Sequence, residues 1–148
     1  MFDDPYTPSC VIGPDEGIIL LGGAHDFPYP LEDYQRSLKD IQSFKKTQNK
    51  DRGRLLILSL IRKIFTMEDL LTKNVTGCTR DSISKKRIAI GKLDASKMMA
   101  IFDQASMQFP GFEEKCYDTK SNTVQCIQDL CKRMRSVNRY QSSSHPPL

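Results

Sequence analysis

Two groups of cationic side chains are the residues of this sequence whose types and spacing best suit a defined chemistry. Lysine and arginine neutralise phosphate groups, and each such contact releases counterions from a nucleic acid. Short hydroxyl side chains beside the first group, such as Thr76 and Thr79, can bond phosphate oxygens. Both groups therefore indicate a polyanion partner. The first group is Arg80, Lys85, Lys86, Arg87 and Lys92, and the second is Lys132, Arg133, Arg135 and Arg139.

A third candidate lies where the last helix is expected to begin, at Lys120, Ser121 and Asn122. The first N–H groups of a helix have no partner within the helix and can bind an anion. A cation and two short polar side chains stand at the same place. The small amide of Asn138, among the cations of the second group, can also bond phosphate oxygens.

Each of these groups also has an interpretation that needs no ligand. Residues 85–87 can be a solvated loop, and the cations of the last helix complement its dipole by roughly a few tenths of a kcal/mol each. Charge alone supports the two interpretations, binding of a polyanion and plain solvation, about equally. If the partner is a nucleic acid, a duplex is favoured over a single strand, because no aromatic residues are interleaved with the cations to stack on unpaired bases.

The residues expected of an active site are missing from the sequence. The two histidines are His25, before a proline-rich turn, and His145, near the end of the sequence. No Gly-x-Ser-x-Gly motif, P-loop lysine motif or Gly-x-Gly-x-x-Gly motif occurs. The carboxylates fall in an acidic N-terminal part or at expected helix starts, such as Asp94, where capping explains them. We therefore expect no enzymatic activity and no cofactor.

The five cysteines form an odd, scattered set without a Cys-x-x-Cys pair, so no metal site is expected. We interpret them as reduced thiols of an intracellular protein. No apolar run reaches the roughly 18 to 20 residues of a membrane helix, and the acidic start of the sequence does not resemble a signal peptide. The sequence therefore predicts no metal and no membrane partner.

The formal net charge of +4 conceals an uneven distribution. Residues 1–42 contain eight acidic and two basic residues, which gives −6, whereas residues 73–92 contain one acidic and six basic residues, which gives +5. An acidic head and a basic body favour a polyanion partner for the body. We also consider that the head folds over the basic surface and tunes access to it.

The elements that must position these cations are predicted to be mostly helical. A short strand is expected within 17–23, paired with residues 10–12 in a hairpin, and a helix follows Pro30. The stretch 45–54 is expected to be a linker. A second helix, from residue 52 or 53 to about 64, is apolar around most of its circumference, which indicates burial. Thr66 is expected to cap a short third helix.

The basic stretch 74–93 has no helical period and is expected to be a loop. Asp94 should cap a fourth helix that ends at Pro110, and Ser121 or Asn122 should cap the last helix. The expected fold class is mainly α, a compact bundle of about five helices with a short β element near the N-terminus. The expected core stripes are Met98, Ile101, Phe102, Ala105 and Phe109 on the fourth helix, and Val124, Ile127, Leu130, Cys131 and Met134 on the last.

A series of motifs in the middle of the chain occurs in a specific order. The apolar helix 54–61 leads into Phe65-Thr66-Met67-Glu68-Asp69-Leu70, and Val75-Thr76-Gly77 and a basic stretch follow. The series continues through Leu93-Asp94 and Ala100-Ile101 to Phe109-Pro110, and the final helix ends in Cys131-Lys132-Arg133-Met134-Arg135. In these motifs the chain resembles a BEN domain over roughly residues 10–139.

The resemblance implies an α-helical module that binds DNA, sometimes with sequence preference, in nuclear proteins of chromatin silencing and transcriptional repression. In that family, DNA is met by the last helix and adjoining loops, and the loop before the fourth helix assists. Carried onto this sequence, the implied DNA-binding residues are Arg80, Lys85, Lys86, Arg87, Lys120, Ser121, Asn122, Lys132, Arg133, Arg135, Asn138 and Arg139.

The expected organisation is an irregular N-terminal segment (1–9), a BEN-like domain (10–139) and a disordered tail (140–148). The expected function is sequence-preferring binding of double-stranded DNA by a nuclear transcriptional repressor or chromatin-associated protein. Corepressor or chromatin proteins and a second copy of the chain, in a homodimer, are further expected partners. The alternative is a protein–protein adaptor, which self-associates or docks a corepressor without touching DNA.

Overall fold

The structure is a computed structural model that describes residues 4–13, 17–23, 27–80 and 83–143, with side chains described up to residue 138. Within these residues the chain forms five helices and three small sheets. Most of the buried apolar side chains come from the helices, so a mainly helical fold is confirmed. The helices are α1 (Leu31–Gln42), α2 (Asn49–Ile64), α3 (Met67–Thr72), α4 (Ala95–Gln108) and α5 (Asn122–Ser143).

The N-terminal sheet has the strand order β1-β2-β3 and is antiparallel throughout. The pairing of β1 with β2 confirms the predicted hairpin. The edge position of β3 suits its two prolines, because a proline has no backbone N–H to donate to a neighbouring strand. Ile19 and Tyr29 are buried, so the sheet closes one end of the helical core. The strands are β1 (Val11–Ile12), β2 (Ile18–Leu20) and β3 (Pro28–Pro30).

The segment 4–9, which we call the strap, has no regular structure but is fastened to α4 by two buried glutamines. Gln108 accepts a hydrogen bond from the backbone N–H of Ser9 at 2.7 Å and donates to two strap carbonyl oxygens at 2.9 and 2.7 Å. Gln104 donates to the carbonyl oxygen of Ser9 at 2.8 Å. The strap therefore belongs to the folded unit that we expected to begin at residue 10.

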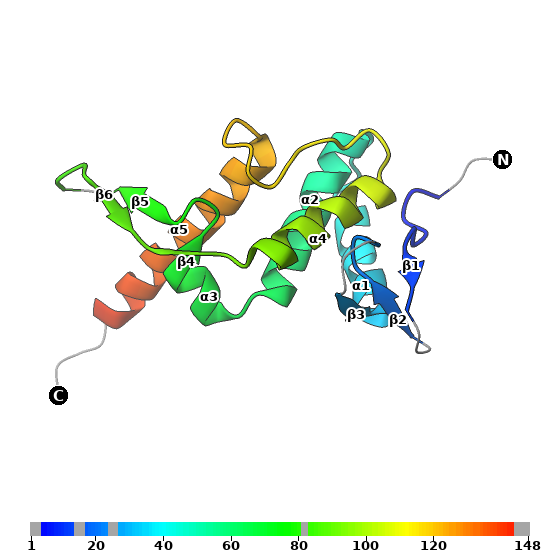
Figure 1. The fold of residues 1–148 in the computed structure, drawn as a ribbon, viewed down its shortest axis with the longest axis horizontal. Coiled ribbons are helices and arrows are strands. Elements are labelled where there is room, and N and C mark those ends of the chain that lie inside the picture. Colours follow the sequence, from blue (N-terminus) through cyan, green and yellow to red (C-terminus); the bar gives the residue numbers. More distant parts are fainter. Residues whose placement is uncertain (1–3, 14–16, 24–26, 81–82, 144–148) are drawn as a thin grey trace.

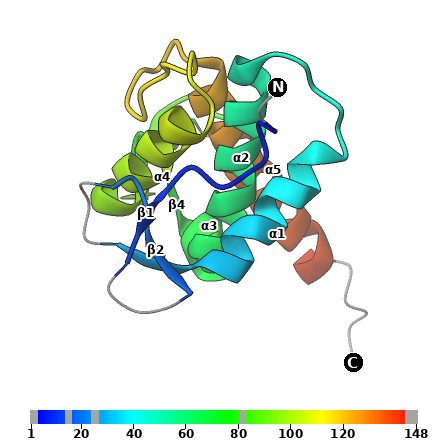
Figure 2. The ribbon, with the colours of Figure 1, turned by 90° about the vertical axis from the view of Figure 1, so that its right-hand side faces the viewer.

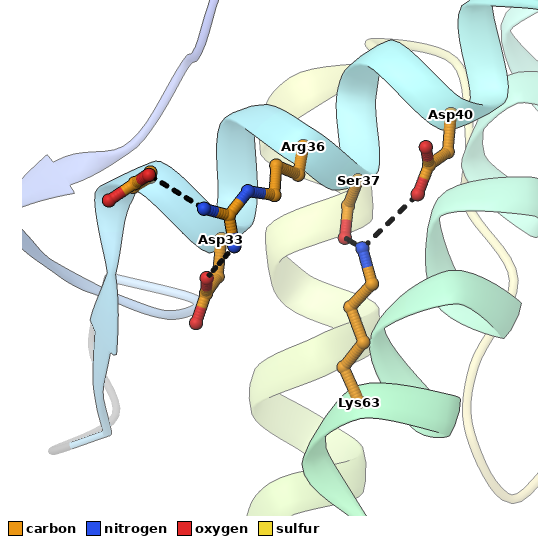
Figure 3. Close-up of polar contacts among 6 residues, drawn as sticks. Asp33, Arg36, Ser37, Asp40 and Lys63 are labelled. Atoms are coloured by element: carbon orange, nitrogen blue, oxygen red, sulfur yellow. Dashed lines mark hydrogen bonds and ion pairs between the residues drawn. The ribbon is translucent and has the colours of Figure 1, made fainter.

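Helix α1 packs its apolar stripe against α2, and polar contacts join the two helices at their edge. The ammonium group of Lys63 donates to the hydroxyl of Ser37 at 3.0 Å and to the carboxylate of Asp40 at 3.3 Å (Figure 3). On the exposed side of α1, Arg36 pairs with two acidic residues of the preceding turn at 2.7 and 3.1 Å. Three acids of the head thus have cationic partners within α1 and α2.

Helix α2 is the central buried helix, as predicted, but it begins at Asn49, three residues earlier than the sequence indicated. Leu56, Leu60 and their apolar neighbours on the inner side have no exposed surface. The earlier start occurs because the side chain of Asn49 donates to the carbonyl oxygen of Pro110 at 2.9 Å, which ties the first turn to the end of α4. The connection between α1 and α2 is therefore shorter than the linker predicted at residues 45–54.

The predicted caps of α3 and α4 are both confirmed. The hydroxyl of Thr66 accepts from the N–H of Asp69 at 3.1 Å, and Asp69 accepts from the N–H of Thr66 at 3.3 Å, which completes a capping box. The carboxylate of Asp94 accepts from the N–H of Lys97 at 3.0 Å. The predicted apolar stripe of α4 is buried along its whole length.

The basic stretch between α3 and α4 is not the plain loop that we expected, because it forms two two-stranded sheets. Asn74 holds the turn that allows this: its side-chain oxygen accepts from the N–H of Gly77 at 2.7 Å, and its amide donates to the carbonyl oxygen of Cys78 at 2.8 Å. The β structure is therefore not confined to the N-terminal region. The strands are β4 (Lys73–Asn74), β5 (Cys78–Arg80), β6 (Arg87–Ala89) and β7 (Gly91–Lys92), paired β4-β7 parallel and β5-β6 antiparallel.

Helix α5 packs on α3 and α2 through the predicted stripe, of which Met134 is the one partly exposed member. Its backbone remains helical through Ser143. The helix thus extends into the stretch from residue 140 that was expected to be a tail, and residues 144–148 lie outside the described residues. No helix of the described chain is long and apolar enough to cross a membrane.

The charged parts of the chain lie at opposite ends of the molecule. The β5–β6 hairpin projects at one end, on the left of Figure 1, whereas α1 and the N-terminal sheet lie at the other end. Figure 2 views that second end and shows α1 beside α2 and the N-terminal strands beside α4. The described part of the acidic head therefore packs on the core and does not cover the hairpin.

Candidate nucleic-acid interface

The β5–β6 hairpin (residues 78–89) carries the first cationic group away from the core. Arg80, Lys85, Lys86 and Arg87 are all exposed, as is Lys92 just after the hairpin. The backbone of Lys85, between the two strands, adopts a φ of 61°, a left-handed value that is typical of turns and not of strands. The hairpin thereby gathers cations that are up to seven positions apart in the sequence on one projecting element (Figure 1).

The register of the hairpin places two of these cations directly opposite each other. Arg80 of β5 is the cross-strand partner of Arg87 on β6. Directly opposed residues point to the same face of a sheet, and like charges in that position are destabilising by roughly 0.2 to 1 kcal/mol. Neither guanidinium group has an acidic partner among the described residues. An anion bound between them would offset this repulsion.

Gln128 joins the base of the hairpin to α5. Its side-chain oxygen accepts from the backbone N–H of Val75 at 2.8 Å, and its amide nitrogen donates to the hydroxyl of Thr76 at 3.1 Å. These two residues begin the turn that leads into β5. The hairpin is therefore held against the last helix by a specific polar contact.

Two cations of α5 lie on the flank that holds the hairpin. Lys132 and Arg135 follow Gln128 at positions i+4 and i+7, which share one side of an α-helix. Lys132 is exposed and Arg135 is partly exposed. The hairpin and this flank therefore form one surface with six cations, which we call the basic face. Its cations are Arg80, Lys85, Lys86, Arg87, Lys132 and Arg135.

Arg135 has an incomplete set of hydrogen bonds. Its Nη1 atom is buried, yet it has no hydrogen-bond partner within the described part of the chain. Leaving a buried donor unpaired costs about 1 to 3 kcal/mol.

The thiol of Cys78 sits at the inner edge of the hairpin in a positive environment. The hydroxyl of Thr76 lies 3.7 Å from its sulfur and Nη2 of Arg87 lies 3.4 Å from it. The hydrogen bond with Thr76, followed by the contact with Arg87, holds the pKa of Cys78 below its usual value. The local field of the hairpin thus stabilises negative charge.

The start of α5 differs from the expected anion site, because the chain supplies its own anion there. The carboxylate of Glu114 accepts from the hydroxyls of Ser121 and Thr123, both at 2.6 Å, and from the N–H of Thr123 at 3.2 Å. Burial alone would raise the pKa of Glu114, but these hydrogen bonds hold it below its usual value. Ser121 is buried, whereas Lys120 and Asn122 are exposed beside this occupied position.

The remaining candidates lie elsewhere on α5. Arg133 and Asn138 line a groove formed with α2 and α3, on the flank away from Gln128. Arg139 lies on the helix, but its side chain falls outside the described residues. The structure thus brings six of the twelve sequence-derived candidates onto the basic face and places Lys120, Asn122, Arg133 and Asn138 apart from it.

Two residues of the site were missed by the sequence analysis. Gln128 is a polar residue on an expected helix, with no local feature that distinguishes it from Gln125. Glu114 lies in the connection between α4 and α5, although a carboxylate seven to nine positions ahead of two hydroxyl residues is consistent with a cap.

Among the described residues, no group of three His, Cys, Asp or Glu side chains could hold a metal ion. No protein-family model matches the chain, and neither a curated protein nor a solved structure matches it.

Proposed function

We propose that this chain is a BEN-type domain that binds duplex DNA with sequence preference, as part of a nuclear transcriptional repressor or chromatin-associated protein. The motif resemblance over residues 10–139, the mainly helical fold and the basic face support this function. The domain would carry out no reaction. It would act by neutralising phosphates and making a few contacts to base edges.

The cross-strand pair of Arg80 and Arg87 is the observation that carries the proposal. Two like charges are fixed on the same face of a short hairpin by backbone pairing, and the hairpin is anchored to α5 through Gln128. A surface needed only for solubility gains nothing from opposed arginines, because dispersed cations solvate equally well without repulsion. A phosphate bridging both guanidinium groups turns the repulsion into binding energy.

The elements of the basic face, a two-stranded hairpin beside a helix, suit a double helix. A two-stranded ribbon fits the major groove of B-form DNA, and cations beside it can follow the phosphates at the groove edge. In this arrangement the hairpin would enter or straddle the groove, and Lys132 and Arg135 would contact the backbone. Arginine and lysine are the usual readers of guanine, so we propose that the base contacts come from the part of the hairpin that enters the groove, while Arg80 and Arg87 hold a phosphate.

Duplex binding measured over a salt series tests the proposal. Each neutralised phosphate contributes about −0.9 to the slope of log affinity against log salt. Four to six contacts from the basic face therefore predict a slope of about −3.6 to −5.4. An affinity that is negligible at low salt, or that does not vary with salt, would overturn the proposal.

A matched pair of double variants locates the contacts. Arg80→Gln with Arg87→Gln should make the slope less steep by about 0.9, because the one phosphate that both arginines bridge is no longer neutralised. Lys39→Gln with Lys46→Gln removes the same charge from exposed lysines outside the hairpin and α5, and should leave the slope unchanged. Selection from random duplexes should enrich a common motif with wild-type protein. Equal losses in both double variants would mean that only net charge matters.

The adaptor function remains the second candidate, because the groove on the other flank of α5 can accept a protein segment. Charge reversal at Lys85, Lys86 and Arg87 separates the two functions. Under the DNA proposal it abolishes duplex binding. Under an adaptor function without DNA contact it alters neither self-association, measured by sedimentation, nor partner binding.

A further inference from the structure

A groove runs along the flank of α5 that faces away from the hairpin, between α5, α3 and the end of α2. Its main part has a volume of about 450 Å³. A second hollow of about 430 Å³ adjoins it toward the start of α5 and shares Arg62, Leu130 and Arg133 with it. The main part is lined by Arg62, Met67, Leu71, Leu130, Arg133, Met134, Val137 and Asn138.

The length of the groove matches a short helix. Along α5 its lining extends from Cys126 to Asn138. Twelve residue steps at 1.5 Å each give about 18 Å, which is roughly three helical turns. An amphipathic helix of a partner lays its apolar side chains into grooves of this kind at positions i, i+3, i+4 and i+7.

The floor of the groove is apolar and adaptable. Met67 and Val137 are 63 % and 53 % exposed, which is high for apolar side chains that lie beside the core. Met67 and Met134 are unbranched, so they can adjust to different apolar partners. An apolar floor offers no hydrogen-bond partner to water. A phosphate group placed against it would lose hydration without compensation, so an apolar partner suits the floor better than a nucleic-acid backbone does.

The rim of the groove is cationic. Arg62 and Arg133 line both hollows, Lys132 lines the second hollow from the edge that it shares with the basic face, and Asp129 is the one acidic residue among the lining residues. None of the three cations forms an ion pair with any residue that the structure describes. The rim therefore has an excess of two positive charges and calls for an acidic partner.

We propose that this groove binds an acidic amphipathic helical segment, about three turns long, of a partner protein. A second copy of the chain does not fit as well, because its acidic amphipathic helix is α1, whose apolar side is already buried against α2. The groove and the hairpin lie on different flanks of α5. The partner would therefore dock without occupying the hairpin and would meet the basic face only at Lys132, so the inference does not rest on DNA binding.

Peptide selection on the whole chain tests this assignment. A displayed random library of peptides about 16 residues long is panned against the wild-type chain, and enriched peptides are synthesised with a fluorescent label. We expect peptides rich in Asp and Glu with apolar residues at helical spacing. Met67→Glu and Arg62→Glu should each weaken their binding at least tenfold, because they place negative charge in the floor and on the rim.

Matched controls keep the result interpretable. Met99→Glu and Lys39→Glu make the same changes at exposed positions of α4 and α1, and should leave peptide binding within twofold of wild type. Met67 is largely exposed, so its replacement should not unfold the domain, and circular dichroism melting checks this. A labelled duplex, measured with the same variants, should bind the Met67→Glu chain as it binds wild type.

Other occupants give different outcomes, and each would overturn the assignment. If no enriched peptide loses binding in the groove variants, the groove has no peptide partner of this class. Concentration-dependent dimerisation that Met67→Glu abolishes would assign the groove to a second copy. Loss of duplex affinity in Met67→Glu to the same degree as in the Arg80 and Arg87 double variant would assign it to DNA.

Discussion

The hydroxyl of Thr123 donates a 2.6 Å hydrogen bond to the carboxylate of Glu114, which lies at the start of α5. The same carboxylate accepts from Ser121, so the first turn of the helix is capped by an anion from the chain itself. An external phosphate at this place would meet a negative charge. Lys120 and Asn122 can therefore contact DNA only beside this position, and the helix N-terminus contributes less to binding than the sequence indicated.

Glu114→Gln should destabilise the domain at neutral pH by about 1 kcal/mol, because an amide forms weaker hydrogen bonds than a carboxylate and does not complement the helix dipole. The folded-state pKa of Glu114 is lowered. Its stabilisation is therefore present above the unfolded-state pKa, near 4.5, and is lost as the pH falls through the lower folded-state pKa. The difference in unfolding free energy between wild type and variant, measured by urea denaturation, should shrink from pH 7 to pH 3.

Asp118→Asn is the matched control for this pH dependence, since Asp118 is exposed and accepts from Lys120 N–H in the same connection. Its effect on stability should stay within about 0.5 kcal/mol. A gap between wild type and Glu114→Gln that stays constant down to pH 3 would show that the carboxylate charge does not stabilise the helix start.

Gly53→Ala should destabilise the domain by about 1 to 2 kcal/mol. A Cβ at this position would lie 2.5 Å from two ring carbons of Phe112, which is itself buried. Overpacking costs roughly 1 to 3 kcal/mol, and this exceeds the gain of up to about 1 kcal/mol from replacing a helical glycine. Thermal melting should show a smaller loss for Gly53→Ala in a Phe112→Leu background, because the smaller side chain makes room. Equal losses in both backgrounds would contradict the steric cause.

Gln108→Leu should destabilise the domain by about 2 to 3 kcal/mol and release the strap. The amide of Gln108 serves two strap carbonyl groups, and its oxygen accepts from Ser9 N–H and from the hydroxyl of Tyr34, both at 2.7 Å. A leucine of similar volume leaves these buried groups unpaired. Amide hydrogen exchange at Ser9 should accelerate. Gln35→Leu, at an exposed position of α1, is the control and should change neither stability nor exchange.

Local signals account for the parts of the fold that could be predicted. Thr66 and Asp94 precede helices and satisfy N–H groups three residues later, so each cap depends on neighbours that the sequence displays together. The apolar stripe of α4 repeats at helical spacing for the same reason. The start of α2 could not be predicted in the same way, because the contact that fixes it joins Asn49 to Pro110, 61 positions away.

The hairpin of the candidate site could not be predicted because its cause is not local. Strands β5 and β6 are three residues long and mostly exposed, so they show no alternation of apolar and polar residues. The turn ahead of them depends on Asn74, and its attachment depends on Gln128, more than 50 positions later. The sequence therefore indicated which residues are cationic but not which of them share a surface.

Gln128→Leu should weaken duplex binding while leaving the charge of the basic face unchanged. The variant loses both hydrogen bonds to Val75 and Thr76, so the hairpin is no longer held at a fixed position against α5. We expect affinity to fall about tenfold, and the salt slope to become less steep, because the hairpin and α5 no longer contact the duplex together. NMR shifts of Val75 and the hairpin amides should change. Gln125→Leu, at an exposed position one turn earlier whose amide donates to the carbonyl oxygen of Thr119, is the control. If Gln128→Leu shifts the hairpin resonances but binds DNA like wild type, the hairpin and α5 do not act as one surface.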